Sequence, residues 1–158
     1  MKYHKIDSKL FIKNRKNFLS KMKPNSVAFF NSNDIYPISA DSTLPFEQHR
    51  DIFYLSGVDQ EESVLMLCSQ ASDTKMQEVL FLKETNDHIA VWEGPKLNKK
   101  QAFEISGIKS VFWLDEMENI IDNVMNECET IYYNHNEHYR AKVEMETREE
   151  RFNKWLDG

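Results

Sequence analysis

Glycine and cysteine are scarce in this chain, and each shortage excludes a class of site. Only four glycines occur among 158 residues. The chain contains no G-x-G-x-x-G, no phosphate-binding loop and no G-x-S-x-G, so the common nucleotide-binding and serine-hydrolase signatures are missing. The two cysteines are too few for a disulfide framework, and we expect Cys68 and Cys128 to be buried reduced thiols. Cys68 stands in the apolar run V-L-M-L-C, which favours a packed, unreactive side chain over a catalytic Cys–His pair.

Long apolar segments and an excess of positive charge are also missing. No run approaches the roughly 20 apolar residues that a membrane-spanning helix needs. The first residues, M-K-Y-H-K-I-D-S-K, lead into no apolar core of a secretory signal. The net charge of −6 argues against a nucleic-acid partner, whose phosphates favour a basic face. We therefore expect a cytoplasmic protein with no nucleic acid and no membrane among its partners.

The rest of the composition is that of one folded domain. Hydrophobic residues make up 41% of the chain and aromatic residues 12%, which is enough to build a core at this length. Helical spacing of apolar residues predicts helices within residues 7–22, between Asn98 and Gly107, and from a capping box at Asp115 and Glu118 onward. A charged helix is predicted from about Glu137, docking through a few apolar residues near the end of the chain.

Short apolar runs predict the strands. These runs cover residues 26–30, 63–68, 79–82, 89–92, 111–114 and 130–133, with a shorter extended piece at 35–38 that Pro37 confines to an edge. The runs at 63–68, 79–82 and 89–92 are expected to form a meander. Residues 52–55 are also read as extended, so that Phe53 and Tyr54 point to opposite faces and at most one of them lines any pocket. This order of elements predicts an α/β domain with a mixed β-sheet flanked by helices.

Two segments resemble a known family. The first is S-A-D-S-T-L-P-F-E-Q-H-R-D-I-F-Y-L-S-G-V-D-Q-E-E-S-V-L-M-L at 39–67, and the second is W-E-G-P-K-L at 92–97. Together they resemble the N-terminal domain of Xaa-Pro aminopeptidases (aminopeptidase P, in the creatinase/prolidase family). The matching positions of the first segment are Asp41, Ser42, Phe46 to Gln48, Asp51, Phe53, Tyr54, Ser56, Gly57 and the strand that opens at Ser63.

The resemblance implies that this chain is one domain of a larger enzyme whose catalytic residues lie in another domain. Residues 1–158 are expected to form a single N-terminal, non-catalytic domain of ribonuclease-H-like fold, with the C-terminal metallopeptidase domain absent from this chain. The parent enzyme would remove an N-terminal residue linked to proline by two-metal hydrolysis. Its two divalent metal ions, expected to be manganese, would lie in the missing domain, so this chain is expected to hold no cofactor, no metal and no catalytic residue.

The implied partners follow from that role. They are the chain's own C-terminal catalytic domain, further copies of the enzyme in a homo-oligomer, and peptide substrates with proline at the second position. Trp92 and Asp41 are the candidate substrate-binding residues, acting on the active site of a neighbouring subunit. The alternatives are that Trp92 closes the core and that Asp41 caps a loop. The cluster H-N-E-H at 135–138 lacks zinc-site spacing, which favours a polar turn over a metal site.

Two other functions remain open on the sequence. A free-standing peptide- or protein-binding module of the same fold would keep the domain without the enzyme. A creatinase-like amidinohydrolase has a related N-terminal domain, but the step from Gln48 to Asp51 and W-E-G-P are closer to the aminopeptidase. Reading the coding sequence beyond Gly158 would separate an enzyme from a free-standing module.

Overall fold

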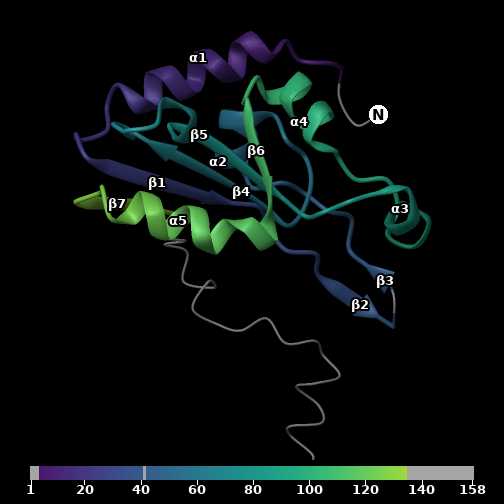
Figure 1. Ribbon diagram of the computed structural model, residues 1–158. Helices are drawn as coiled ribbons and strands as arrows, with labels where there is room; N and C mark the ends of the chain where they lie inside the picture. Colours follow the sequence, from purple (N-terminus) through teal and green to yellow (C-terminus); the bar gives the residue numbers. More distant parts are fainter. Residues whose placement is uncertain (1–3, 41, 135–158) are drawn as a thin grey trace, which may run out of the picture.

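A five-stranded mixed β-sheet forms the centre of the molecule (Figure 1). The computed structural model describes residues 4–40 and 42–134. Three antiparallel strands lie in the middle of the sheet, and one parallel strand is added at each edge, giving the order β6-β5-β4-β1-β7. The strands are β1 (Ser26–Asn31), β4 (Ser63–Cys68), β5 (Glu78–Leu82), β6 (Ser110–Trp113) and β7 (Thr130–Tyr133). All five agree with the predicted runs to within one residue at each end.

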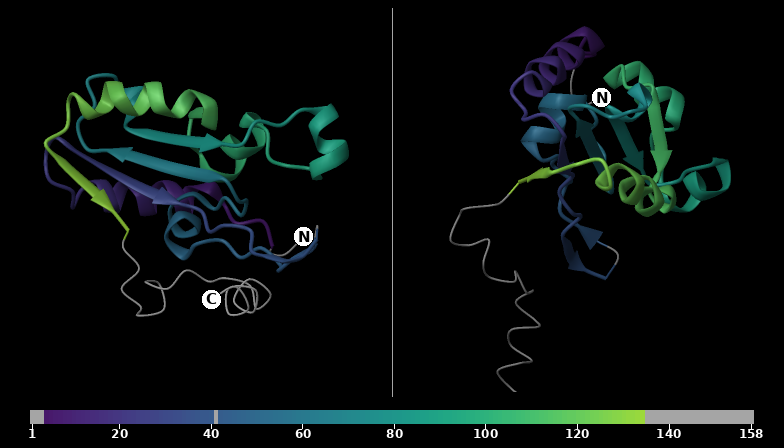
Figure 2. Two further views of the ribbon diagram at one scale, coloured as in Figure 1. Left: turned by 90° about the horizontal axis from the view of Figure 1, so that it is seen from below. Right: turned by 60° about the vertical axis from the view of Figure 1, so that its left-hand side comes forward.

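Alternate residues of the strands face two separate cores. On one face, residues such as Ala28 and Leu65 pack with α1 (Ser8–Leu19), α2 (Arg50–Ser56) and α4 (Lys99–Ser106). On the other face, residues such as Val27 and Met66 pack against α5 (Met117–Met125). Figure 2 shows these helices on the two sides of the sheet. The prediction of a mixed sheet flanked by helices is therefore confirmed.

Arg15 joins the three helices that share one face. Its side chain is completely buried, and its Nε donates to a Glu78 carboxylate oxygen at 2.9 Å. Its Nη1 donates to the carbonyl oxygens of Leu55, at 2.8 Å, and of Ser106, at 3.0 Å. These carbonyls belong to the last turns of α2 and α4, where a cation is favourable. Burial lowers the pKa of Arg15, while the charge and hydrogen bond of Glu78 oppose that shift.

Helices α2 and α4 end in the same way. Each ends in a Ser-Gly pair, and the glycine is left-handed, with φ of 71° at Gly57 and 73° at Gly107. The hydroxyls of Ser56 and Ser106 each donate to the carbonyl four residues earlier, at 2.7 Å in both helices. The same hydroxyls accept a hydrogen bond from the backbone amide two residues later. The chain therefore turns sharply out of both helices into the core.

Two short segments predicted as extended are helices, and those predictions were wrong. Residues 89–92 lie in α3 (Asp87–Glu93), because Asn86 Oδ1 accepts from the amides of His88 and Ile89 and starts a helical turn. Residues 52–55 lie in α2, which begins after His49 and ends at Gly57. The predicted meander therefore contains β1, β4 and β5 and not residues 89–92.

The remaining elements are short. β2 (Pro37–Ser39) pairs with β3 (Ser42–Thr43) in a separate two-stranded sheet, in agreement with the extended piece predicted around Pro37. Single 3₁₀ turns lie at Thr74–Met76 and Leu114–Glu116. The prediction that Asp115 and Glu118 form a capping box at the start of α5 was wrong. The Trp113 amide instead donates to the Glu116 carboxylate at 2.8 Å. The charged helix predicted from Glu137 lies outside the described residues.

No helix in the described part of the chain has both the length and the apolar character that crossing a membrane would require.

Candidate functional site

Several residues of the first motif hold α2 and the loop that follows it in place. The Gln48 amide nitrogen donates to the backbone oxygens of Val58 and Gln60, at 3.1 and 2.8 Å. The Asp51 carboxylate accepts from the Asn134 side chain at 2.7 Å, beyond the end of β7. Gly57 provides the left-handed turn that ends α2. These motif residues build the fold and shape the loop that follows α2.

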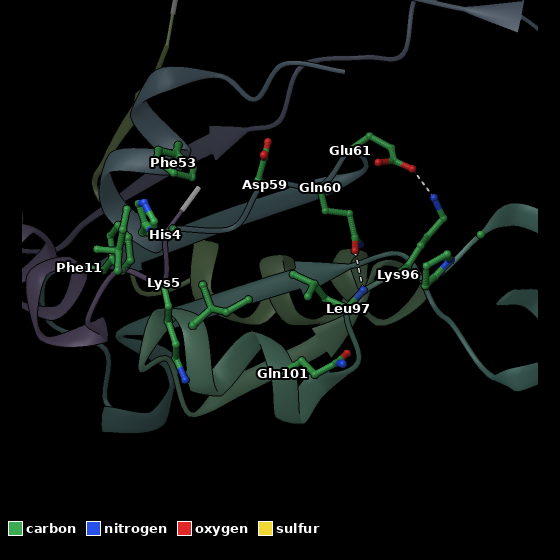
Figure 3. A pocket seen from close by; sticks show the side chains of 15 residues that line it. His4, Lys5, Phe11, Phe53, Asp59, Gln60, Glu61, Lys96, Leu97 and Gln101 are labelled. Carbon is green, nitrogen blue, oxygen red and sulfur yellow. Dashed lines mark hydrogen bonds and ion pairs between the residues drawn. The ribbon is translucent and has the colours of Figure 1, made fainter. Parts of the chain in front are cut away.

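That loop lies beside the second motif, so the two motifs meet in space (Figure 3). The Gln60 side-chain oxygen accepts from the Leu97 amide at 2.7 Å. The Lys96 ammonium forms an ion pair with the Glu61 carboxylate. The exposed fraction of these two charged side chains is only 10% and 15%, so the ion pair is largely shielded from solvent.

The same loop also holds the chain on the other side of α3. Lys83, which directly follows β5, forms an ion pair with Glu62 at 2.9 Å, and its amide donates to the Glu62 carbonyl at 3.2 Å. Both ends of the segment between Lys83 and Lys96, which carries α3, are therefore bound to residues 60–62. We call residues 60–62 the clamp, because they fix both ends of this segment.

Electrostatics keep the clamp charged. Burial alone would raise the pKa of Glu61, but hydrogen bonds from Lys96 and from its own backbone amide act against it. The charges of Lys96 and Lys83 act in the same direction, and the net pKa of Glu61 is lowered. The carboxylate is therefore ionised at neutral pH, as an ion pair with lysine requires.

Of the two candidate substrate-binding residues, Trp92 lies within the described residues and Asp41 does not. Trp92 lies in the last turn of α3, and its neighbour Val91 is 75% exposed. Asp41 falls in the sequence between β2 and β3 and lies outside the described residues. Helix α3 and the β2–β3 hairpin project beyond the same end of the sheet, on the right in Figure 1 and in the left panel of Figure 2. The elements that carry or flank both candidates are thus brought to one end of the domain.

Each of these projecting elements carries or adjoins exposed apolar side chains. Ile38 is 52% exposed on β2, Leu44 follows β3 at 49%, and Val91 lies on α3. Ile35, which precedes β2, is also exposed. We call these four residues the projecting surface. Exposed apolar side chains on elements that stand away from the core suit contact with another molecule.

A cavity of about 750 Å³ lies next to the clamp. Its walls come from the N-terminal segment, α1, the loop after α2, residues 94–97 and α4, and include Phe11, Phe53 and Leu97 (Figure 3). Phe53 is half-buried and packs edge-on against Phe11, with ring centroids 6.3 Å apart. A second cavity of about 410 Å³ is lined by both Phe53 and Tyr54. The prediction that at most one of the pair lines any pocket was wrong, because neighbours on a helix are about 100° apart and can share a groove.

The described residues contain no group of three or more His, Cys, Asp or Glu side chains placed to hold a metal ion. The cluster at 135–138 lies outside the described residues.

Comparison with known proteins gives a consistent result. The family model described as "Aminopeptidase P, N-terminal domain" matches residues 11–132. The Xaa-Pro aminopeptidase of Escherichia coli is 27% identical over 138 residues, which is 87% of this chain and 31% of that protein. Human Xaa-Pro aminopeptidase 3 is 24% identical over 65% of this chain and 20% of its own length. The chain thus spans about a third or less of the length of these relatives.

Solved structures agree with the sequence matches. The aminopeptidase P of E. coli, determined with the inhibitor Pro-Leu, superposes with a TM-score of 0.74 at 27% identity, covering 89% of this chain and 32% of that one. The aminopeptidase PepP of Pseudomonas aeruginosa superposes with a TM-score of 0.76 over 97% of this chain and 33% of its own, at 21% identity. The second likeness concerns the fold alone.

Proposed function

Because this chain belongs to the aminopeptidase P N-terminal domain family, we propose that it is the non-catalytic part of an enzyme that removes an N-terminal residue linked to proline. The catalysis takes place in a C-terminal domain that holds two divalent metal ions, with manganese as the proposed metal. The proposed setting is the cytoplasm, and the proposed assembly is a homo-oligomer. Within it, this domain shapes the access of the peptide substrate to an active site.

The clamped position of α3 is the observation that carries this proposal. A helix of seven residues that stands away from the sheet has few contacts of its own, yet ion pairs and a backbone hydrogen bond hold the chain on both sides of it. Fixation of this kind suits a segment that presents a side chain to another molecule, because the supporting contacts hold that side chain in position. The projecting surface lies at the same end of the domain and supports the same role.

Trp92 and Asp41 have complementary chemistry for a peptide that begins Xaa-Pro. An indole ring offers a flat apolar surface to the pyrrolidine ring of proline. A carboxylate offers an acceptor to the free amino group of the substrate, or to an arginine across a subunit interface. Both residues are proposed to act on the active site of a neighbouring subunit, and neither takes part in bond breaking.

The test uses the full-length enzyme that carries this domain. Trp92→Ala and Asp41→Asn should each lower kcat/KM for an Xaa-Pro peptide, because a contact with the bound substrate is lost. Lys99→Met, which removes an exposed ion pair elsewhere on the domain, should leave kcat/KM unchanged. Unchanged kinetics in both variants would contradict the proposed contact.

The isolated chain provides the second half of the test. Trp92→Ala should change its free energy of unfolding by no more than about 0.5 kcal/mol if the ring is exposed. A loss of about 3–5 kcal/mol would identify Trp92 as a core residue and remove it from the proposal. The isolated chain should also cleave no Xaa-Pro peptide, with or without added manganese. Saturable peptide binding by the isolated chain would favour the free-standing binding module instead.

A further inference from the structure

The two cysteines of the chain face each other. The sulfur of Cys68 lies 3.9 Å from the sulfur of Cys128, although the residues are 60 positions apart in the sequence. Cys68 is the last residue of β4, and Cys128 lies between α5 and β7. Both are free thiols. Two sulfurs in contact across such a separation are brought together by the fold and not by local sequence.

Both sides of this contact are held in place by hydrogen bonds. The Cys68 amide donates to the Gln77 carbonyl at 2.9 Å, and the Cys128 amide donates to the Met125 carbonyl at 3.2 Å. Next to Cys128, the Glu127 carboxylate accepts from the hydroxyl and the amide of Ser72, at 2.6 and 3.1 Å. These bonds tie the turn after α5 to the connection between β4 and β5. The two sulfurs are therefore kept close in the native state.

The two thiols differ in their access to reagents. Cys68 is 2% exposed, whereas Cys128 is half-buried. Burial raises the pKa of Cys128 to about 11, with further contributions from Cys68 and from the charge of Glu127. At that value only about one thiol in ten thousand is ionised at pH 7, so the reaction of Cys128 is slow at neutral pH and speeds up as the pH rises.

We propose that Cys68 and Cys128 are an oxidisable dithiol, which a small-molecule disulfide such as oxidised glutathione converts to an intrachain disulfide bond. The Cys128 thiolate attacks one sulfur of the small disulfide, forms a mixed disulfide and releases one thiolate. The Cys68 thiolate then attacks the Cys128 sulfur, closes the protein disulfide and releases the second thiolate. The two protons lost by the protein thiols end on the two released thiols. The protein dithiol is oxidised by two electrons, and the small disulfide is reduced by two.

The bond would join the end of β4 to the turn between α5 and β7. Since Cys128 lies in a turn, it can make the small movement that brings the sulfurs from contact to a bond of about 2.0 Å. The closed loop contains 60 residue steps and includes β5, β6 and α5. A covalent link across a loop of this size restricts the unfolded chain and so stabilises the native state.

The experiment treats the native protein with oxidised glutathione and follows its intact mass. The wild type should lose the mass of two hydrogen atoms, and digestion without reduction should release a linked peptide pair that contains both cysteines. The reaction rate should rise about tenfold for each pH unit between about pH 7 and pH 10. The oxidised protein should melt several degrees higher than the reduced protein, and a reductant should reverse the shift.

Two single variants assign the steps. Cys68→Ser should stop the reaction at the mixed disulfide, adding one glutathione to Cys128. Cys128→Ser should leave Cys68 unmodified in the native protein, since that thiol is buried. The proposal is overturned if the native wild type keeps glutathione on Cys128, if it forms links only between separate chains, or if its thiols are oxidised only in the unfolded state.

Discussion

Gly57 packs directly against the ring of Phe11, and the ring leaves no room for a Cβ atom at that position. Phe11 is 3% exposed and cannot move away without disturbing the core. Gly57→Ala should therefore lower the free energy of unfolding by about 2–5 kcal/mol, since it combines left-handed backbone strain with overpacking. Urea denaturation of the isolated chain measures this loss.

Gly107 supplies the matched control for that substitution. Its backbone is almost identical, with φ of 73°, but an added Cβ would meet the end of Ile12, at 2.7 Å. Ile12 is 42% exposed and can turn toward solvent. Gly107→Ala should thus cost only the backbone strain, about 1–2 kcal/mol. Equal losses in the two variants would show that the contact with Phe11 contributes nothing.

The ion pair that the fully buried Arg15 forms with the partly exposed Glu78 should matter more than a fully exposed pair. Glu78→Gln removes the charge opposite a fully buried guanidinium and should cost about 3–5 kcal/mol in unfolding free energy. Lys99→Met breaks the exposed pair with Glu116, together with the contact of its ammonium over the Trp113 ring at 4.8 Å, and should cost no more than about 2 kcal/mol. Urea melts of the two variants at the same pH provide the comparison, and a smaller loss for Glu78→Gln would contradict the role given to Arg15.

The clamp should make stability depend on pH in the acidic range. The folded-state pKa of Glu61 lies below its ordinary value of 4.5. The contribution of this carboxylate is therefore complete above that value and is lost as the pH falls through the lower folded-state pKa. The difference in unfolding free energy between wild type and Glu61→Gln should shrink between about pH 5 and pH 3. A difference that is constant over this range would exclude the mechanism, and the exposed Glu104→Gln serves as the control.

Loosening the clamp should free α3 without unfolding the sheet. Lys96→Met removes one of the interactions that hold the segment between Lys83 and Lys96. Amide exchange of residues 87–93 should become faster, while exchange in β4 and β5 stays at the wild-type rate. Faster exchange throughout the domain would mean that Lys96 stabilises the whole fold and not α3 in particular.

The sheet could be predicted from the sequence because its strands are continuous apolar runs bounded by polar turns. β4 and β5 are buried on both faces, so neither depends on a weak alternating pattern. The helix from Asn98 to Gly107 was equally predictable, because a capping asparagine and a terminal glycine mark its ends. Apolar runs, capping residues and terminal glycines involve residues close together in the chain, so they can be recognised in a single sequence.

The errors have a common physical cause. Residues 52–55 and 89–92 are short apolar runs, and four residues do not distinguish a strand from one turn of helix. What decides the matter is capping: Asn86 starts α3, and His49 and Gly57 bound α2. The clamp and the burial of Arg15 were not predicted, because they depend on partners 21 to 91 positions away, which no local pattern reveals.

The hydrogen bonds of Arg15 also impose an order on folding. Its partner Ser106 lies 91 positions later in the chain, and Leu55 lies 40 positions later. Contacts between distant residues form slowly, because the intervening chain must first be closed into a loop. In a chain synthesised from its N-terminus, α1 is made before α4 but cannot complete the hydrogen bonds of its arginine until α4 has been made. Pulse labelling during refolding should therefore find β4 and β5 protected before α1, although α1 precedes both strands in the chain.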